Sequence, residues 1–418
     1  MSQASTTAVA SRPLFVRALR SIAVWGPGLL VMLADTDAGN VVTAAQSGAQ
    51  WGYRLLPLLL LMIPLLYMVQ EITVRLGIYT GQGHGELIRD RFGRHWSWLA
   101  ALGLIVATVG SMVTEFTGVA GIGEMYGLSR AISLPIAAIM LFAVVATGSY
   151  RRMERAAILI GMFELAFFFV AWVAHPDPVV MAHHALDLPL GNHDFLFLAA
   201  ALIGAVFNPW MIFYQQSAVA DKKLRPEHHR AARWDTAFGA VLTQLLTAAV
   251  LVAAAATLAG KADASTLNTV GDISKALTPY LGGEAGRLIF SIGVLGAAMV
   301  AAIVSSLAMA WGVGEVAGYR RSLEFRPAQA PWFYGAYALC IIASAGAVWL
   351  VPDLVWLNVG TQVVNALMLP MVIGFLVALA TKALPEAQRL RGVYLWLLIA
   401  ASVATCALGL YGGLSPLF

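Results

Sequence analysis

The chain of 418 residues contains a succession of apolar segments that are each long enough to cross a lipid bilayer. A transmembrane helix needs about 20 apolar residues, because each residue rises about 1.5 Å through a hydrocarbon core about 30 Å thick. Only 11% of the residues are charged, against about 25% in soluble globular domains. We predict an all-α polytopic membrane protein with eleven spans, at residues 22-47, 54-74, 97-123, 131-149, 155-173, 194-219, 234-260, 286-313, 333-351, 353-381 and 393-412.

The positive charges between the predicted spans are unevenly distributed. If the amino terminus is cytoplasmic, 21 of the 26 Lys and Arg residues fall on that side, which is the distribution expected of cytoplasmic loops. We therefore expect a cytoplasmic amino terminus, and eleven spans then put the carboxyl terminus outside. The asymmetry also accounts for the formal charge of +4. No basic stripe with interleaved aromatic residues indicates a nucleic-acid partner.

The predicted spans divide into two halves. We interpret residues 1-21 as a cytoplasmic tail, because they contain no apolar core followed by a cleavage site. Residues 22-173 and 194-381 then form two repeats of five helices, joined by an extracellular loop at 174-193, and residues 382-418 form a cytoplasmic loop and the eleventh helix. An odd number of helices in each half gives the halves opposite topology. Inverted repeats of this kind are typical of secondary transporters.

Two of the apolar segments are interrupted where an unbroken helix is expected, and each is the first helix of its half. The first interruption includes Asp35, Asp37 and Asn40, and the second includes Asn208 and Pro209. Backbone leaves the helical ladder at membrane depth only where protein or a watery cavity covers it. In secondary transporters, paired interruptions mark the central binding site. We therefore predict a substrate site between these two segments.

The first break carries two carboxylates within three residues, which is costly in hydrocarbon. A cation would compensate them. Asp37 supplies a charged oxygen, Asn40 supplies a neutral one, and Gly39 is expected to let the backbone turn so that freed carbonyl groups face inward. The alternative is that Asp37 only caps the amino terminus of a half-helix, and the two roles can coexist.

The second break adds uncharged oxygens. Pro209 removes a backbone hydrogen bond, which frees a carbonyl near Ala205 as a possible ligand. Asn208 adds an amide oxygen, and Trp210 adds bulk that narrows or shapes a cavity. A proline kink without a ligand role is the alternative for this segment, and the pairing of the two breaks favours a site. Gln362 in the tenth predicted helix offers another oxygen, or else an interhelical hydrogen bond.

Three stretches in the first two predicted helices resemble the NRAMP divalent-metal transporters, whose motifs read GPG…DPGN, aGAqaGY and RLGvvTG. The stretches are Gly26-Pro-Gly through Asp37-Ala-Gly-Asn40, Gln46-Ser-Gly-Ala-Gln-Trp-Gly-Tyr53 and Arg75-Leu-Gly-Ile-Tyr-Thr-Gly81. The resemblance extends over nearly the whole chain. It implies a LeuT/APC-type fold, alternating access and a divalent metal at the two unwound helices. It assigns as ligands Asp37, Asn40, the Ala205 carbonyl and Gln362.

The departures from the family pattern bear on the choice of ion. The family has Met-Pro-His in its sixth helix, where this chain has Asn208-Pro209-Trp210. An amide oxygen thus replaces a thioether, and an all-oxygen site suits Mg²⁺, Ca²⁺ or Mn²⁺. Asp35 replaces an uncharged residue of the family, and it either widens the cavity for a partly hydrated ion or lines the water path. The chain resembles the NRAMP-related magnesium transporters of bacteria, so we expect a monomer in the bacterial inner membrane that imports Mg²⁺ and Mn²⁺ and needs no cofactor.

Most of the residues that couple metal to protons in the family are missing. Met112 stands at the position of an aspartate in the third helix, whereas the family's glutamate remains as Glu115. The predicted ninth helix lacks the family's arginine, and Tyr214-Gln-Gln-Ser217 stands where a histidine precedes serine. We expect weak or absent proton coupling, with the membrane potential supplying about 2.3 kcal/mol per charge per 100 mV.

Two other functions stay open at this point, a proton-coupled Mn²⁺/Fe²⁺ importer and an amino-acid carrier on the same fold. The sequence contains no His-Glu-x-x-His, Gly-x-Ser-x-Gly or phosphate-binding Gly-Lys-Ser/Thr motif, so we do not expect an enzyme. Among the remaining polar residues, we expect Glu71 and Glu315 to pair with loop arginines and Glu164 to pack between helices. The pairs His183-His184 and His228-His229 are expected on a solvated surface.

Overall fold

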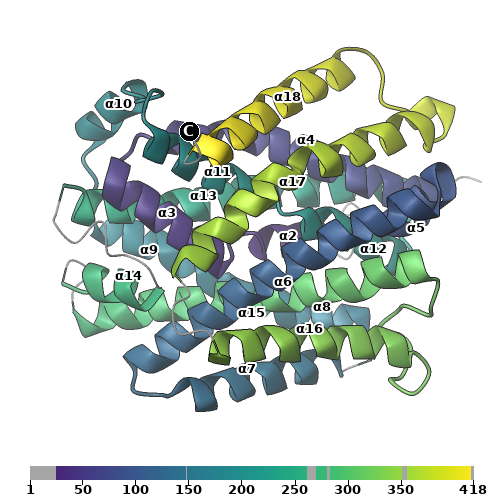
Figure 1. Cartoon of the computed structure of the whole chain (residues 1–418), viewed down its shortest axis with the longest axis horizontal. Helices are drawn as coiled ribbons and strands as arrows, with labels where there is room; N and C mark the ends of the chain where they lie inside the picture. Colours follow the sequence, from purple (N-terminus) through teal and green to yellow (C-terminus); the bar gives the residue numbers. More distant parts are fainter. Residues whose placement is uncertain (1–24, 147, 261–269, 280–282, 351–354, 416–418) are drawn as a thin grey trace, which may run out of the picture.

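The computed structural model describes residues 25–415 except 147, 261–269, 280–282 and 351–354. The predicted amino-terminal tail, residues 1-21, lies outside the described residues, as do the ends of several predicted spans. The described part is helical and contains no strand. Figure 1 shows most of the long helices running roughly along the longest axis of the molecule, packed side by side. Polar residues as well as apolar ones are buried inside this bundle.

The helices match the predicted spans. Among the described residues, nine helical segments are long and apolar enough to cross a membrane. The shorter α7 and the broken pair of α2 and α3 bring the number to the predicted eleven. The bounds are α2 Pro27–Leu33, α3 Ala38–Trp51, α4 Leu56–Thr80, α6 Arg94–Met125, α7 Arg130–Val145, α8 Tyr150–Gly161, η1 Met162–Leu165, α9 Ala166–Val173, α11 His193–Val206, α12 Pro209–Asp221, α13 His229–Leu258, α15 Glu284–Ala317, α16 Pro331–Leu350, α17 Val355–Lys382 and α18 Gly392–Leu414.

Several short helices lie between the predicted spans. They are α5 His84–Phe92, α10 Pro178–Leu186, α14 Val270–Leu277, η2 Pro226–His228 and η4 Glu386–Gln388. The predicted extracellular loop at 174-193 therefore contains α10. This helix begins at Pro178, and the side chain of the preceding Asp177 caps it by accepting hydrogen bonds from the amides of Val179 and Val180. A helix of nine residues is too short to show a clear apolar period in a sequence.

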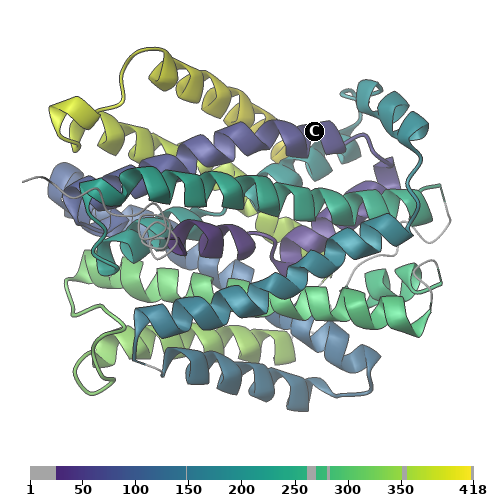
Figure 2. The ribbon, with the colours of Figure 1, turned by 180° about the vertical axis from the view of Figure 1, so that it is seen from behind.

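Both predicted helix breaks are present. The first separates α2 from α3, with Asp37 as the amino-terminal cap of α3. The second separates α11 from α12, which begins at Pro209. Asn208 has extended backbone, as the residue before a proline usually does. Figure 2 shows the long teal α13 running past the purple α2 and α3, and α13 packs against both.

The predicted turn at Gly39 is wrong. Gly39 lies in the first turn of α3, and the chain turns before it, at residues 34–37. A Cβ at this position would collide with the side-chain amide of Gln362, so glycine leaves room for that amide beside the first turn of α3. Gly204 plays the same part on α11, where a Cβ would overlap the Gln362 carbonyl and lie 2.8 Å from the Ala366 nitrogen. These two glycines bring Gln362 against both breaks.

The first residues of α2 are tied to three other helices. Asp235 of α13 accepts hydrogen bonds from the amides of Gly26, Gly28 and Leu29 at 2.8–3.1 Å. Lys222, directly after α12, donates to the Trp25 carbonyl at 3.0 Å and to the Glu154 carboxylate of α8 at 2.9 Å. The Lys222 and Glu154 side chains are each only 7% exposed. We call this set of contacts the α2 anchor.

The close approach at Gly204 can be tested with a pair of matched substitutions. Gly204→Ala should lower the free energy of unfolding by about 1–3 kcal/mol, because the added methyl group forces α11 and α17 apart. Gly374→Ala is the control, since a Cβ there meets nothing within 4 Å. That variant should be as stable as the wild type or more so, since alanine favours helix. Thermal unfolding in detergent measures both, and equal melting temperatures would contradict the packing described.

Candidate metal site

The first break is stabilised by two carboxylates. Asp37 Oδ1 accepts the Asn40 amide at 2.6 Å, and Glu115 Oε2 of α6 accepts the Ala38 amide at 3.1 Å. The capping role considered for Asp37 is therefore present. Asn40 Nδ2 donates to the Asp35 carbonyl at 2.9 Å, whereas Asn40 Oδ1 is buried without a hydrogen-bond partner in the described part of the chain. The side-chain oxygen of Asn40 therefore accepts no hydrogen bond from the described residues that form this break.

The second break frees a carbonyl at the predicted residue. Pro209 has no N–H, so no amide one turn later closes the helical bond of the Ala205 carbonyl. This carbonyl instead accepts from Asn208 Nδ2 at 2.9 Å. Asn208 Oδ1 accepts from Asn365 Nδ2 of α17 at 2.5 Å, and the same Nδ2 lies 3.1 Å from Gln362 Oε1. A chain of amide contacts therefore joins α12 to α17.

The two breaks meet through Asp35 and Gln362. The side chains of Asn208 and Thr243 lie close enough to the Asp35 carboxyl to interact with it, and Thr243 Oγ1 is 3.5 Å from Asp35 Oδ2. On the other side, the Gln362 amide abuts Gly39, next to Asp37. The predicted ligand residues therefore form one cluster in which no member is more than 1% exposed: Asp35, Asp37, Asn40, Ala205, Asn208 and Gln362. Trp210 is fully buried at the start of α12, and its role in shaping a cavity stays a prediction.

The cluster is acidic and lacks a positive partner. Asp35, Asp37, Glu115 and Glu164 are all at most 1% exposed, and among the described residues none of them forms an ion pair with Lys or Arg. Buried carboxylates without a partner are costly in a membrane interior, so a cation would stabilise this region. A divalent ion would balance the two aspartates of the first break.

The donor atoms are oxygens. Asp35 Oδ1, Asn40 Oδ1 and Asn365 Oδ1 are buried, and none has a hydrogen-bond partner in the described ranges. The same ranges contain no group of three or more His, Cys, Asp or Glu side chains arranged to hold a metal. A metal here would rely on carboxylate, amide and carbonyl oxygens together. This is the ligand chemistry of hard divalent ions.

Three polar residues beside the cluster were not predicted to belong to the site. Asn365 lies three residues after Gln362, so helical spacing alone could have indicated it. Thr243 bridges Asp35 and Thr36, whose hydroxyl is 2.8 Å away, from an unbroken part of α13 that carries no signal. Glu164, expected only to pack, lies in the 3-10 turn η1 with both carboxylate oxygens buried and without a hydrogen bond to any described residue.

A known protein family matches most of the chain. The model of the Nramp family, described as natural resistance-associated macrophage protein-like, matches residues 28–415. The chain belongs to the Nramp family. One relative is the divalent metal cation transporter MntH of Agrobacterium fabrum, which is 26% identical over 301 residues. The aligned stretch covers 69% of this chain and 65% of the length of that relative.

Solved structures share the fold of this Nramp chain. The Eremococcus coleocola manganese transporter has a TM-score of 0.78 at 19% identity, covering 98% of this chain and 88% of that one. A Na⁺-coupled sialic acid symporter has a TM-score of 0.58 at 14% identity, covering 94% and 90%. At these identities the likeness concerns the fold alone. It confirms the predicted LeuT-type fold with two five-helix repeats and an eleventh helix.

The two roles of Asp37 can be separated by one substitution. In Asp37→Asn the side chain still caps α3, because asparagine is as good a cap as aspartate, but the negative charge is lost. We expect the melting temperature without metal to match the wild type or exceed it. Affinity for Mn²⁺ should fall at least about tenfold in titration calorimetry, a change of about 1.4 kcal/mol. Asp177→Asn, at the cap of α10, is the control with the same chemical change. Unaltered Mn²⁺ affinity in Asp37→Asn would mean that Asp37 only caps.

Proposed function

We propose that this protein imports divalent metal ions, with Mg²⁺ and Mn²⁺ as its substrates. The observation that carries the proposal is the cluster where the two broken helices meet. Its two aspartates, amide oxygens and free carbonyl are buried without a cationic partner among the described residues. An ion that is small, doubly charged and bound by oxygen complements this cluster.

Selectivity for hard ions is supported by the second break. Asn208 stands where the family has methionine, and its Oδ1 lies within the amide chain that reaches Gln362. Without that thioether the site loses the donor that favours Cd²⁺ and other soft ions. A half-turn of the Gln362 amide would bring its oxygen to the place of the unpartnered Nε2, beside Gly39. We infer that this rotation accompanies ion binding.

A second candidate function is proton-coupled import of Mn²⁺ or Fe²⁺. The names of the relatives support it, since they specify divalent metal cations and manganese. Against tight coupling, Glu115 Oε2 is engaged by the Ala38 amide as a cap. Met112 also stands where the family has an aspartate. We therefore propose weak or absent coupling. An amino-acid substrate is disfavoured, because its carboxylate would face Asp35 and Asp37.

We infer that transport proceeds by alternating access. The cluster is at most 1% exposed, so an ion bound there would be closed off from both sides of the membrane. The α2 anchor holds the first half-helix against α8, α12 and α13 on the side that the charge distribution assigns to the cytoplasm. Release into the cytoplasm then requires α2 to part from Asp235 and Lys222.

The function is tested directly by uptake into proteoliposomes with a dye for the metal and a second dye for pH. Mg²⁺ and Mn²⁺ should enter when the lumen is made negative, and the luminal pH should stay constant. Empty liposomes and the Asp37→Asn variant are the controls. Uptake of Mn²⁺ that acidifies the lumen would select the proton-coupled candidate, and absence of uptake for both ions would refute divalent import.

The hard-ion preference is tested by Asn208→Met. This substitution restores a thioether, so Cd²⁺ and Mn²⁺ should compete better against Mg²⁺ uptake than they do in the wild type. Leu202→Met adds a thioether to the buried face of α11 with little change in volume and should leave selectivity unchanged. If competition by Cd²⁺ is the same in all three proteins, donor softness does not decide selectivity.

A further inference from the structure

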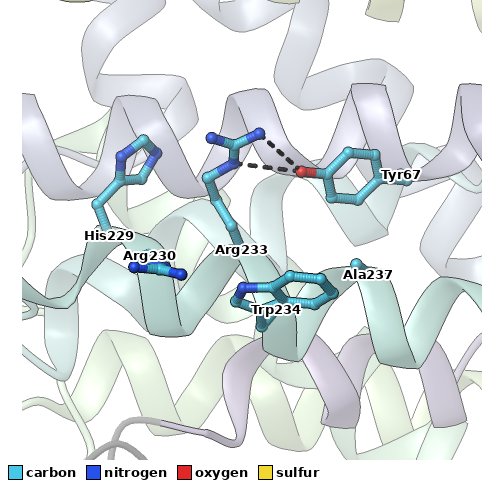
Figure 3. Close-up of a pocket in the computed structure, with 6 residues that line it drawn as sticks. All are labelled: Tyr67, His229, Arg230, Arg233, Trp234 and Ala237. Carbon is cyan, nitrogen blue, oxygen red and sulfur yellow. Dashed lines mark hydrogen bonds between the residues drawn. The ribbon is translucent and has the colours of Figure 1, made fainter.

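A basic pocket lies on the outer surface of the helix bundle, away from the metal cluster. It has a volume of about 610 Å³ and is lined by Tyr67 of α4 and by residues of α13: His229, Arg230, Arg233, Trp234 and Ala237. Figure 3 shows the two arginines and the indole on successive turns of α13, with the Tyr67 ring across from them. The spacing of three and four residues places the α13 side chains on one face of the helix.

The positive charge of this pocket exceeds what the protein itself neutralises. Glu71 is buried beside the pocket and is paired with Arg75 at 2.8 Å, whereas Arg233 is 3.5 Å from it. Arg233 donates to the Tyr67 hydroxyl at 3.1 Å and remains 44% exposed. Arg230 is exposed and pairs with no described acidic side chain. The three arginines and the one carboxylate leave an excess of two positive charges.

The neighbouring ionisable groups do not cancel this excess. His229 was expected on a solvated surface, but its side chain is only 14% exposed and its Nε2 lies 3.4 Å from Glu71. Glu227, in the turn before α13, is turned toward His228 at 3.5 Å and is 72% exposed. Even if Glu227 is counted, the pocket retains a positive charge.

An apolar stripe continues from the pocket along α13. Trp234, Phe238, Val241 and Leu245 are 63%, 50%, 42% and 40% exposed, and they follow one another at helical spacing. On a membrane-spanning helix such side chains face the hydrocarbon. The basic side chains are at the start of α13, and the stripe runs from them toward the bilayer centre. The charged end of this surface would therefore face a lipid headgroup, and the apolar end would lie along the acyl chain of the same lipid.

We propose that this pocket binds an anionic phospholipid, with the phosphate at Arg230 and Arg233 and an acyl chain along the stripe. A guanidinium group can donate two parallel hydrogen bonds to the oxygens of one phosphate. Indole rings favour the membrane interface. Basic pockets between helices on the cytoplasmic side are the places where such headgroups bind. A free phosphate ion would use the two arginines alone, whereas the apolar stripe favours the lipid. The proposal does not depend on which metal is transported.

The experiment is native mass spectrometry of the purified full chain titrated with phosphatidylglycerol or with phosphatidylcholine of the same acyl chains. The wild type should bind phosphatidylglycerol more tightly. Each basic side chain near an anionic surface contributes about fivefold to the affinity. The affinity for phosphatidylglycerol should therefore fall about fivefold in Arg230→Gln and about 30-fold in Arg230→Gln/Arg233→Gln. Arg151→Gln/Arg152→Gln removes the same charge from the exposed start of α8 and should bind phosphatidylglycerol as the wild type does.

Each remaining outcome overturns the proposal. Equal affinity in the wild type and in both arginine variants would mean that the pocket does not bind the lipid. An equal loss in the α8 control would mean that only total charge matters. Displacement of the lipid by millimolar inorganic phosphate would indicate a free-anion site instead.

Retention of Mn²⁺ binding in every variant checks that the variant is folded. If the double variant does not fold, the affinity of Arg230→Gln for phosphatidylglycerol tests the proposal.

Discussion

Hydrocarbon offers no hydrogen bonds to a broken helix, and this constraint organises the centre of the molecule. Every break exposes backbone amides and carbonyls that must find partners inside the protein. At the first break the partners are Asp37 and Glu115, and at the second the partner of the free carbonyl is Asn208. Two of these residues, Asp37 and Asn208, stabilise the backbone and are also among the residues proposed to bind the ion.

This double use links stability to transport. The caps of α3 bring the carboxyl groups of Asp37 and Glu115 to the centre of the bundle, where no described Lys or Arg forms an ion pair with them. A divalent ion would relieve that charge and would hold the two half-helices together while it is bound. At the other end of α2, the anchor formed by Asp235 and Lys222 closes the same half-helix. The first half-helix is therefore held at one end by protein contacts and at the other end by groups suited to an ion.

The spans could be predicted from the sequence, because length and apolarity identify them in a bilayer, whereas the LeuT-type packing of the spans was predicted from the resemblance to the Nramp family. Both breaks could be predicted as well. Two aspartates in the first break and Pro209 in the second cannot continue an apolar helix without compensation. Gly39 was misinterpreted because glycine permits both a turn and close packing, and only the position of Gln362 distinguishes them. Thr243 could not be foreseen, because it reaches the site from an unbroken stretch of α13. The short helices α5, α10 and α14 have only eight or nine residues each, which is too few for a clear apolar period in the sequence.

The central claim is that one divalent ion binds where α2–α3 and α11–α12 come apart. Crystals grown with Mn²⁺ and measured at the manganese absorption edge test it most directly. The account predicts one strong anomalous peak between Asp37 and Asn208, within coordination distance of oxygens from both breaks, and loss of that peak in Asp37→Asn. A peak elsewhere in the molecule, with none between the breaks, would contradict it.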